Sequence, residues 1–416
     1  MQENVNWKKL LDCALGISAR LLKNGAEISR VEDTVEKICM AYGAQSVDVV
    51  AIPAKVEATL ETNDDWFTTK IRRVYDVSLD LGKIEDLNKM SRWVVSERPA
   101  VDDIYKAIKD FDDKKEPNWM IILKCISAFI ACGTLAIMYG GSIRDGLSSG
   151  VVSLIMAILL FTLGRFGNYK IFNTLILSII GGFLSVGLYY INIGQHISYI
   201  MIGAVMLLIP GKEFGIAFRE LMMRDLISGA IRIFQALIIT LAIVIGFSIP
   251  IAIFNYNIDA YSFHNAAITI SMGVIANTMY GIIFGAKLKR LPYIFVGSII
   301  VTGVFVLMEK YSDSLLLNVF IAQMCGALFA EIIAKIVHMP TVVCLLTTNL
   351  ALVPGGLLYY TVYALWNNGI GAKMYLTKVM YSSLGIGAGI LVISILFNTI
   401  NRIISSKKEI EVNKME

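Results

Sequence analysis

The sequence predicts an α-helical polytopic membrane protein with about ten transmembrane helices, arranged as two inverted five-helix repeats and preceded by a small α+β cytosolic domain. Of its 416 residues, 56% are hydrophobic and only 17% are charged, and the mean hydropathy is +0.66. These values exceed those of a soluble globular protein of this length. Most acidic residues fall within the first 118 positions. The apolar segments that follow contain two similar Pro-Gly interruptions, which suggest an internal repeat.

Residues 1–117 are expected to form the cytosolic α+β domain. Apolar residues recur at three- and four-residue spacing over 7–22 and 26–42, and Gly25 and Gly43 supply helix stops. The stretches "SVDVVAI", "KVEATLET" and "WFTTKIRRVYDV" are rich in β-branched and aromatic residues and predict three strands. Two amphipathic helices follow at about 83–96 and 102–111. The amino terminus has no signal-peptide pattern, so we expect this domain to stay in the cytosol.

The second helix of this domain carries a group of charged residues. Two carboxylates on one helix face could perform acid–base chemistry or receive a basic partner, whereas a solvated or domain-docking face would explain the same pattern. No nucleophile elbow, phosphate-binding loop or dinucleotide fingerprint accompanies them, so we expect no enzyme activity. The charged residues are Glu27, Arg30, Glu32, Asp33 and Glu36.

The remainder of the chain contains ten apolar segments of about the length that spans a bilayer. Lys and Arg concentrate in the connections that would face the cytosol, with Arg144 and Lys373 as exceptions. This places both termini in the cytosol, with a first repeat at 118–258, a second at 259–403 and a charged tail at 404–416. The segments lie at about 120–140, 147–163, 171–192, 196–211, 229–253, 264–286, 292–309, 315–337, 341–363 and 376–400.

Cysteine and histidine usage argues against metal or cofactor chemistry. The six cysteines show no C-x-x-C spacing, and the three histidines are far apart in the sequence. We therefore expect no metal, no cofactor and no disulfide framework. The net charge of +4 comes mainly from short connections between apolar segments, so it gives no argument for a nucleic-acid partner.

Two motifs indicate the repeat. "IMYGG" around Tyr139 matches "TMYGI" around Tyr280, 141 residues later, and Pro210-Gly211 is followed 144 residues later by Pro354-Gly355. Each half then holds five spans. Because five is odd, the second half would enter the membrane from the opposite side.

The Pro-Gly pairs predict interrupted helices at a substrate site. Pro cannot donate a backbone hydrogen bond, and Gly lets the chain leave helical dihedral angles. Freed backbone groups are tolerated at membrane depth only where protein or a water-filled cavity satisfies them. Paired breaks in inverted halves therefore point to a transport site. A kink or a helix end at the interface is the alternative, above all for Pro210. The predicted binding residues here are Pro210, Gly211, Pro354, Gly355 and Gly356.

Polar residues within apolar spans are further candidates, because they are costly in a membrane. Thr347, Thr348 and Asn349 precede the second break, and we expect them to bind substrate, although Thr347 could simply bond its own helix. Glu331 could carry a coupling proton or form an ordinary ion pair with Lys335. Asp225 is a second candidate for proton coupling, although it is expected on the cytosolic side. The other polar residues within the spans are Asn277, Thr278 and Gln323.

Three segments resemble the threonine/serine exporter family. "LLKNGAEISRVEDTVEKICMAYG" resembles the family's opening signature, "GAVMLLIPGKEFGIAFRELMMRDLISGAIRIFQA" is similar to its first membrane half, and "EIIAKIVHMPTVVCLLTTNLALVPGGLLYY" resembles its second half. The resemblance covers almost the whole chain, with both halves fused. It implies export of threonine and serine across the bacterial cytoplasmic membrane, driven by the proton-motive force. The first break departs from the family pattern, because Lys212-Glu213 follows Pro-Gly.

The leading hypothesis is therefore a secondary exporter whose partners are the lipid bilayer, a small-molecule substrate and protons. Two-component relatives are associated with succinate export, so a dicarboxylate is the alternative substrate, with Lys212 or Arg232 supplying the extra cation. A passive channel and a membrane-embedded enzyme are the other classes; no span contains a recognisable catalytic pattern. Formation of a homo-oligomer and a sensing role for the amino-terminal domain stay open.

Overall fold

The computed structural model describes residues 6–63, 66–75, 77–163, 169–210, 213, 216–217, 220–221, 225–254, 265–366 and 371–412. The chain divides into two compact units. The first comprises Met1–Lys124 together with Gly281–Arg290, and the second comprises Cys125–Tyr280 together with Leu291–Glu416. A short segment between two distant apolar helices therefore belongs to the amino-terminal unit.

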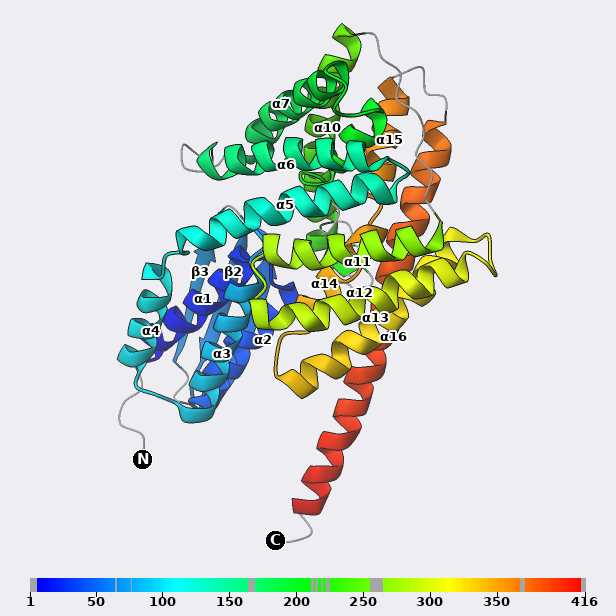
Figure 1. The fold of residues 1–416 in the computed structure, drawn as a ribbon. Coiled ribbons are helices and arrows are strands. Elements are labelled where there is room, and N and C mark those ends of the chain that lie inside the picture. The colour runs from blue at the N-terminus through cyan, green and yellow to red at the C-terminus, as the bar shows by residue number, and fades with distance from the viewer. Residues whose placement is uncertain are drawn as a thin grey trace. The chain divides into compact units, whose positions relative to one another are not determined.

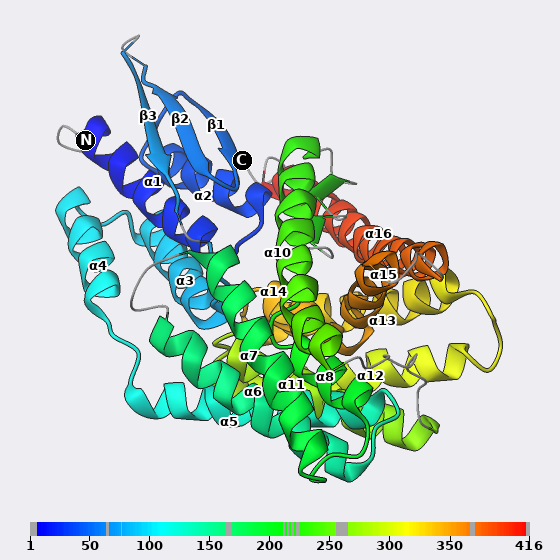
Figure 2. The ribbon, with the colours of Figure 1, turned by 90° about the horizontal axis from the view of Figure 1, so that it is seen from above.

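The amino-terminal unit contains the predicted three-stranded sheet (Figure 2). Strands β1, β2 and β3 form an antiparallel meander, in which Ser46 pairs with Glu61 and Lys55 pairs with Arg73. Central strand β2 alternates buried and half-buried residues, so only one face is covered, and helices α1 and α2 pack against the sheet. The elements are α1 Trp7–Lys23, α2 Ile28–Ala41, β1 Ser46–Ile52, β2 Lys55–Glu61, β3 Phe67–Arg73, α3 Leu81–Glu97 and α4 Val101–Asp113.

The charged residues of α2 hold the amino-terminal unit together. Glu32 accepts a 2.9 Å hydrogen bond from the backbone N–H of Ala51 in β1. Arg30 donates to Asn88 of α3 at 3.2 Å. The domain-docking interpretation of this helix face therefore accounts for two of its charges.

The segment Gly281–Arg290 is bound to α3 by a buried charge cluster. Arg290 donates to both carboxylate oxygens of Glu85, at 3.0 and 3.2 Å, and Glu85 is only 1% exposed. Lys287 lies 3.5 Å from the same carboxylate and also pairs with Asp86. Burial alone would raise the pKa of Glu85, but the hydrogen bond from Arg290 and the charge of Lys287 outweigh it and lower the pKa to about 2.

Backbone contacts complete this attachment. The N–H of Leu81 donates to the carbonyl of Phe284 at 2.8 Å. Gly285 has φ +74°, and a Cβ there would lie 2.7 Å from a carboxylate oxygen of Asp80, so only glycine fits without strain. The segment 281–290 is thus an integral part of the amino-terminal unit. We call the four charged residues that attach it the α3 clamp: Glu85 and Asp86 of α3 with Lys287 and Arg290.

The second unit is a helical membrane domain (Figure 1). Among the described residues, eight helices are long and apolar enough to cross a membrane. They correspond to eight of the ten predicted segments. These helices are α5 Asn118–Met138, α6 Ile143–Leu163, α7 Lys170–Tyr190, α10 Leu226–Ile253, α11 Ala266–Ile283, α12 Leu291–Met308 (preceded by η1 Leu288–Arg290), α13 Leu315–Val337 and α16 Ala372–Val412.

The other two predicted segments are interrupted, and they are the two that contain Pro-Gly. Segment 196–211 forms the short helix α8, Ile197–Val205, and then leaves helical geometry before Pro210. Segment 341–363 divides into α14 Val342–Thr347, the 3₁₀ turn η2 Leu350–Leu352 and α15 Gly355–Trp366. Both interruptions lie where the sequence predicted helix breaks.

The turn between α5 and α6 is fastened by Asp145, which is fully buried. Its carboxylate accepts hydrogen bonds from the backbone N–H groups of Ser142, Gln195 and His196, at 2.9, 2.6 and 2.8 Å. Nδ1 of His196 lies 3.0 Å from the same carboxylate. This buried charge therefore ties the start of α6 to the start of α8.

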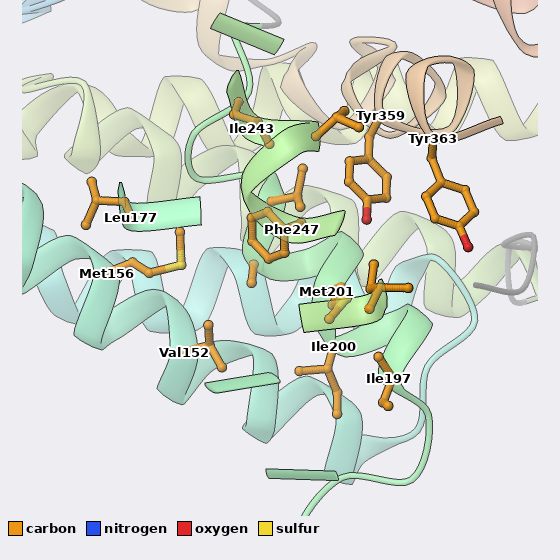
Figure 3. Close-up of a cluster of buried hydrophobic side chains, with 14 of the residues drawn as sticks. Val152, Met156, Leu177, Ile197, Ile200, Met201, Ile243, Phe247, Tyr359 and Tyr363 are labelled. Carbon is orange, nitrogen blue, oxygen red and sulfur yellow. The ribbon is translucent and has the colours of Figure 1, made fainter. Parts of the chain in front are cut away.

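A buried apolar cluster places α15 against the first half of the membrane domain (Figure 3). Tyr359 and Tyr363 project from α15 with their rings stacked at 6.3 Å between centroids, and Tyr359 meets Phe247 of α10 edge to face. The same cluster contains Val152 of α6 and Met201 of α8. The helix that follows the second break thus packs into a core made by α6, α7, α8 and α10.

Candidate functional site

The second break is a buried, non-helical stretch between α14 and α15. Val353 has extended dihedral angles, and the missing N–H of Pro354 prevents a continuous helix. Beyond it, Leu358 donates to the carbonyl of Pro354 at 2.9 Å, the first i→i−4 bond of α15. The amides of Gly356 and Leu357 therefore stand at a helix N-terminus without an intrahelical carbonyl.

Asn277 of α11 satisfies backbone groups that the break releases. Its side-chain amide donates to the carbonyl of Thr348 at 2.7 Å, and its carbonyl oxygen accepts from the N–H of Ala351 at 2.8 Å. Ser382 of α16 donates to the carbonyl of Leu352 at 3.1 Å. Asn277 is fully buried, so its side chain takes the place of helical hydrogen bonds where no water is available.

The polar residues before the break fall into two groups. Thr347 donates to the carbonyl of Val343 at 2.7 Å, so it bonds its own helix, as the simpler interpretation expected. Asn349 donates to Gln323 of α13 at 2.9 Å. Within the described part of the chain, Oγ1 of Thr348 and Nε2 of Gln323 are buried and have no hydrogen-bond partner. Neither residue is among those that line the cavity described next.

A cavity of about 470 Å³ reaches the break. Its size suits a small molecule. It is bordered by the break, by the connection between α12 and α13, and by the first turns of α16. Its lining residues are Tyr139, Phe305, Glu309, Ser312, Asp313, Leu315, Asn318, Val319, Ala351, Leu352, Val353, Pro354, Gly356, Leu357, Met374, Tyr375, Lys378 and Ser382.

The residues before the first break lie against the second break. Pro210 is buried, whereas Gly211 and Lys212 lie outside the described residues. A Cβ built on Gly355 would lie 2.7 Å from Cγ2 of Ile209 and 3.2 Å from Sδ of Met206. The structure therefore brings Pro210 and Gly355 into one region, although they are far apart in the sequence.

Two tyrosines connect the two halves of the membrane domain, because each contacts the break in the other half. Tyr280 of α11 donates to the carbonyl of Met206, beside the first break, at 2.9 Å. Tyr139, just after α5, lines the cavity, and its ring lies next to Gly356 of the second break. Each repeated M-Y-G motif thus places its tyrosine at the break of the other half.

The two acidic candidates for proton coupling lie apart from the cavity lining. Glu331 of α13 is half-buried and lies 3.5 Å from the hydroxyl of Thr341. The nearby Lys335 places its ammonium group 4.6 Å from the ring centroid of Phe397. Asp225 immediately precedes α10, where burial raises the pKa of its carboxyl above the ordinary value.

Arg232, the candidate cation for a dicarboxylate, already has an anionic partner. Its Nε donates to Glu220 at 2.8 Å, and both side chains are almost fully buried. Among the described residues, no group of three or more His, Cys, Asp or Glu side chains could hold a metal ion.

Sequence reasoning missed part of the cavity lining. Glu309, Asp313 and Lys378 were not candidates, because they stand at the ends of apolar segments, where charges are ordinary. Tyr139 and Tyr280 were used only to measure the repeat distance. The recurrence of tyrosine in both motifs was the available signal that these side chains contact the two breaks.

This arrangement defines the class of the protein: a multi-pass membrane protein of the transporter type, with broken helices meeting beside a cavity. The chain belongs to the threonine/serine exporter family. Residues 12–254 match the family model described as "Putative threonine/serine exporter", and residues 269–396 match a second model described as "Threonine/Serine exporter, ThrE".

Curated relatives agree with this assignment. A "Probable threonine/serine exporter" of Mycobacterium tuberculosis is 22% identical over 277 residues, which cover 66% of this chain and 50% of that protein. The "Pheromone-regulated membrane protein 10" of Candida albicans is 27% identical over 197 residues, covering 45% of this chain and 17% of that protein. The matches thus span half or less of these relatives. No solved structure matches the chain.

Proposed function

We propose that the protein is a secondary exporter of small hydrophilic amino acids, threonine and serine, across the bacterial cytoplasmic membrane. The observation that carries this proposal is the buried break at Pro354, which opens to a cavity of about 470 Å³ in a chain of the threonine/serine exporter family. Both termini lie in the cytosol in this proposal. The cavity, which reaches the α12–α13 connection and the start of α16, then opens on the outer face.

The transport cycle rests on ten spans in two inverted repeats, 118–258 and 259–403, which follow a cytosolic domain at 1–117 and precede a tail at 404–416. The reciprocal contacts of Tyr139 and Tyr280 with the opposite breaks support this architecture. The turns that follow α5 and α11 are also alike, because Gly141 and Ala286 each donate to the carbonyl five residues earlier. Alternating access would rock one repeat against the other around the two breaks.

Substrate would bind where the break presents amides to the cavity. Gly356 and Leu357 line the cavity at the N-terminus of α15, where the helix dipole favours a carboxylate. Oγ1 of Thr348 is a buried polar atom without a partner, beside the same break. We assign the carboxylate to the α15 amides and the polar remainder to Thr348 and Asn349.

Coupling to the proton-motive force is assigned to Glu331 first and Asp225 second. Glu331 is half-buried in a membrane-spanning helix, where an ionisable side chain is costly unless it functions. The raised pKa of Asp225 eases protonation. Replacing Glu331 with Gln should abolish the response to a pH gradient while facilitated exchange continues.

The test is efflux from loaded proteoliposomes, comparing threonine, serine and succinate with and without an imposed pH gradient. Gradient-dependent movement of threonine and serine is the expected result. Movement of succinate alone would replace the substrate with a dicarboxylate, and movement insensitive to the gradient would indicate a passive channel.

The same assay tests the break. Gly355→Leu should insert normally and lose transport, because its side chain would fill the space taken by Ile209 and Met206. Gly303→Leu is the matched control, since a Cβ at Gly303 meets nothing within 4 Å. Unaltered transport in Gly355→Leu would remove the break from the mechanism.

A further inference from the structure

Hydrogen-bond acceptors line the cavity from the connection between α12 and α13 and from the start of α13. Glu309 and Asp313, on the connection between α12 and α13, both line it. Asn318 of α13 lines it as well, and this side chain is 3% exposed. Its Nδ2 donates to the carbonyl of Ser312 at 2.9 Å, but its Oδ1 is buried and has no partner among the described residues. An unsatisfied buried acceptor beside two carboxylates suits a ligand that donates hydrogen bonds and carries positive charge.

Hydrogen-bond donors line the same cavity from α15 and α16. Lys378 of α16 lines it, and within the described part of the chain no ion pair involves this ammonium group. Gly356 and Leu357, at the N-terminus of α15, line it as well. Together they offer one full positive charge and a favourable helix dipole to an anion.

We propose that the cavity is a zwitterion site, with an ammonium pole formed by Glu309, Asp313 and Asn318 and a carboxylate pole formed by Lys378 and the first turn of α15. This inference rests on the proposed function and specifies its substrate class: α-amino acids with both charged groups free. The acceptors and the cation come from different elements, so the site distinguishes the two ends of its ligand.

The charges that line the cavity also disfavour the alternative substrate, a dicarboxylate. A dicarboxylate would place its second anionic group toward Glu309 and Asp313, where like charges repel. Partial burial already raises the pKa of the Glu309 carboxyl. A bound ammonium group would stabilise that carboxylate, whereas a second anion would destabilise it further. Selection against dicarboxylates is therefore built into the same residues that bind the ammonium group.

The experiment is competition against labelled L-threonine, measured both as equilibrium binding to the purified full chain in detergent and as exchange in proteoliposomes. The probes are unlabelled L-threonine, threonine methyl ester, 3-hydroxybutyrate and succinate. The ester lacks the carboxylate charge, and 3-hydroxybutyrate lacks the ammonium group. In the wild-type protein each analogue should bind at least about tenfold more weakly than threonine, because each leaves one charged pole unpaired.

The variants should change this ranking in opposite ways. Lys378→Gln should weaken threonine about fivefold and leave the ester unchanged, whereas Glu309→Gln with Asp313→Asn should weaken threonine and leave 3-hydroxybutyrate unchanged. Lys378→Arg should restore binding. Lys310→Gln and Lys373→Gln are controls, because both lysines are exposed nearby and neither lines the cavity.

The outcomes separate the two proposals. A wild-type protein that binds threonine with the expected ranking but does not transport it would overturn the proposed function and support the zwitterion site. Transport of threonine with an analogue ranking that none of the variants changes would overturn the zwitterion site and leave the proposed function standing. Preferential binding of succinate would overturn both.

Discussion

The two Pro-Gly breaks differ in how the surrounding helices support them. At the second break, the side chain of Asn277 bonds two released backbone groups, Ser382 bonds a third, and a cavity opens beside them. At the first break, the chain leaves α8 after Val205, and Tyr280 bonds the carbonyl of Met206. The cavity therefore reaches the second break, where the side chains of Asn277 and Ser382 replace the missing helical hydrogen bonds.

This difference shows how neighbouring helices can stabilise a break. Proline and glycine only interrupt the helix, and polar side chains from other helices must then stabilise the open backbone at membrane depth.

A second difference concerns the turns that follow α5 and α11. Asp145 ties the first turn to the start of α8, whereas Arg290 ties the second to Glu85 in the amino-terminal unit. The turn that follows α11 is thus bonded within the amino-terminal unit, to which it belongs.

The largest expected effect comes from removing the support of the second turn. Arg290→Gln leaves the Glu85 carboxylate buried without its main partner, and breaking a buried pair costs about 3–5 kcal/mol. Hydrogen exchange of α3 peptides in the full chain should rise strongly. The control is Lys83→Gln, which affects an exposed lysine on the same helix. Unchanged protection in Arg290→Gln would show that the α3 clamp is dispensable.

The pH dependence of this unit follows from the same pair. The pKa of Glu85 lies at about 2 in the folded protein, below its ordinary value of 4.5. Its contribution to stability is therefore full above about pH 4.5 and is lost as the pH falls toward 2. Thermal unfolding of the full chain between pH 7 and pH 3 should show this loss in the wild type and a smaller loss in Glu85→Gln. Parallel curves for the two proteins would contradict it.

Asn277→Ala should have the next largest effect. It leaves the carbonyl of Thr348 and the N–H of Ala351 buried and unbonded, at a cost of about 2–4 kcal/mol. Transport should fall with stability, as measured by exchange in proteoliposomes and thermal unfolding in detergent. Thr278→Val is the matched control, because the hydroxyl of Thr278 bonds its own helix, at the carbonyl of Val274. Equal losses in both variants would remove the special role of Asn277.

A smaller effect is expected where the two breaks touch. Gly355→Ala places a Cβ 2.7 Å from Ile209, and overpacking of this kind costs about 1–3 kcal/mol. We expect the maximal rate of exchange to fall more than the affinity for threonine, because the two breaks must move past each other during transport. Gly303→Ala, with open space around it, should leave both quantities unchanged. A fall in affinity alone would argue for a static contact.

The smallest effect on stability is expected from changing Tyr280, whose hydroxyl bonds the backbone beside the first break. Tyr280→Phe removes the hydrogen bond to the carbonyl of Met206 and should cost about 1 kcal/mol in thermal unfolding. This is less than for Asn277→Ala, since one backbone group loses its partner instead of two. An effect as large as that of Asn277→Ala would show that the two breaks are equally supported.

The sequence predicted the elements better than it predicted their contacts. Apolar length identified eight long helices, and Pro210 and Pro354 marked the two segments that are broken, because proline and glycine act locally on the backbone. Alternating β-branched residues likewise predicted the sheet. Such patterns act within a few residues, so they can be interpreted without knowledge of the fold.

The site could be predicted only in part, since it is assembled from distant residues. Thr348 and Asn349 were found because they stand next to Pro354. The link from Asn277 to Thr348 spans 71 positions, and no spacing rule connects two helices at that distance. Lys378 and Glu309 looked like ordinary charges at the ends of spans. Only the packing of α16 beside α13, visible in Figure 1, brings them to one cavity.

The α3 clamp also sets an order of events during synthesis. Glu85 is translated 205 residues before Arg290. At roughly 5–20 residues per second, its carboxylate waits about 10–40 seconds for its partner. The amino-terminal unit therefore completes its fold only after α11 has been made and its end has emerged on the same side as α3. Formation of the Glu85–Arg290 pair therefore cannot precede the synthesis of α11.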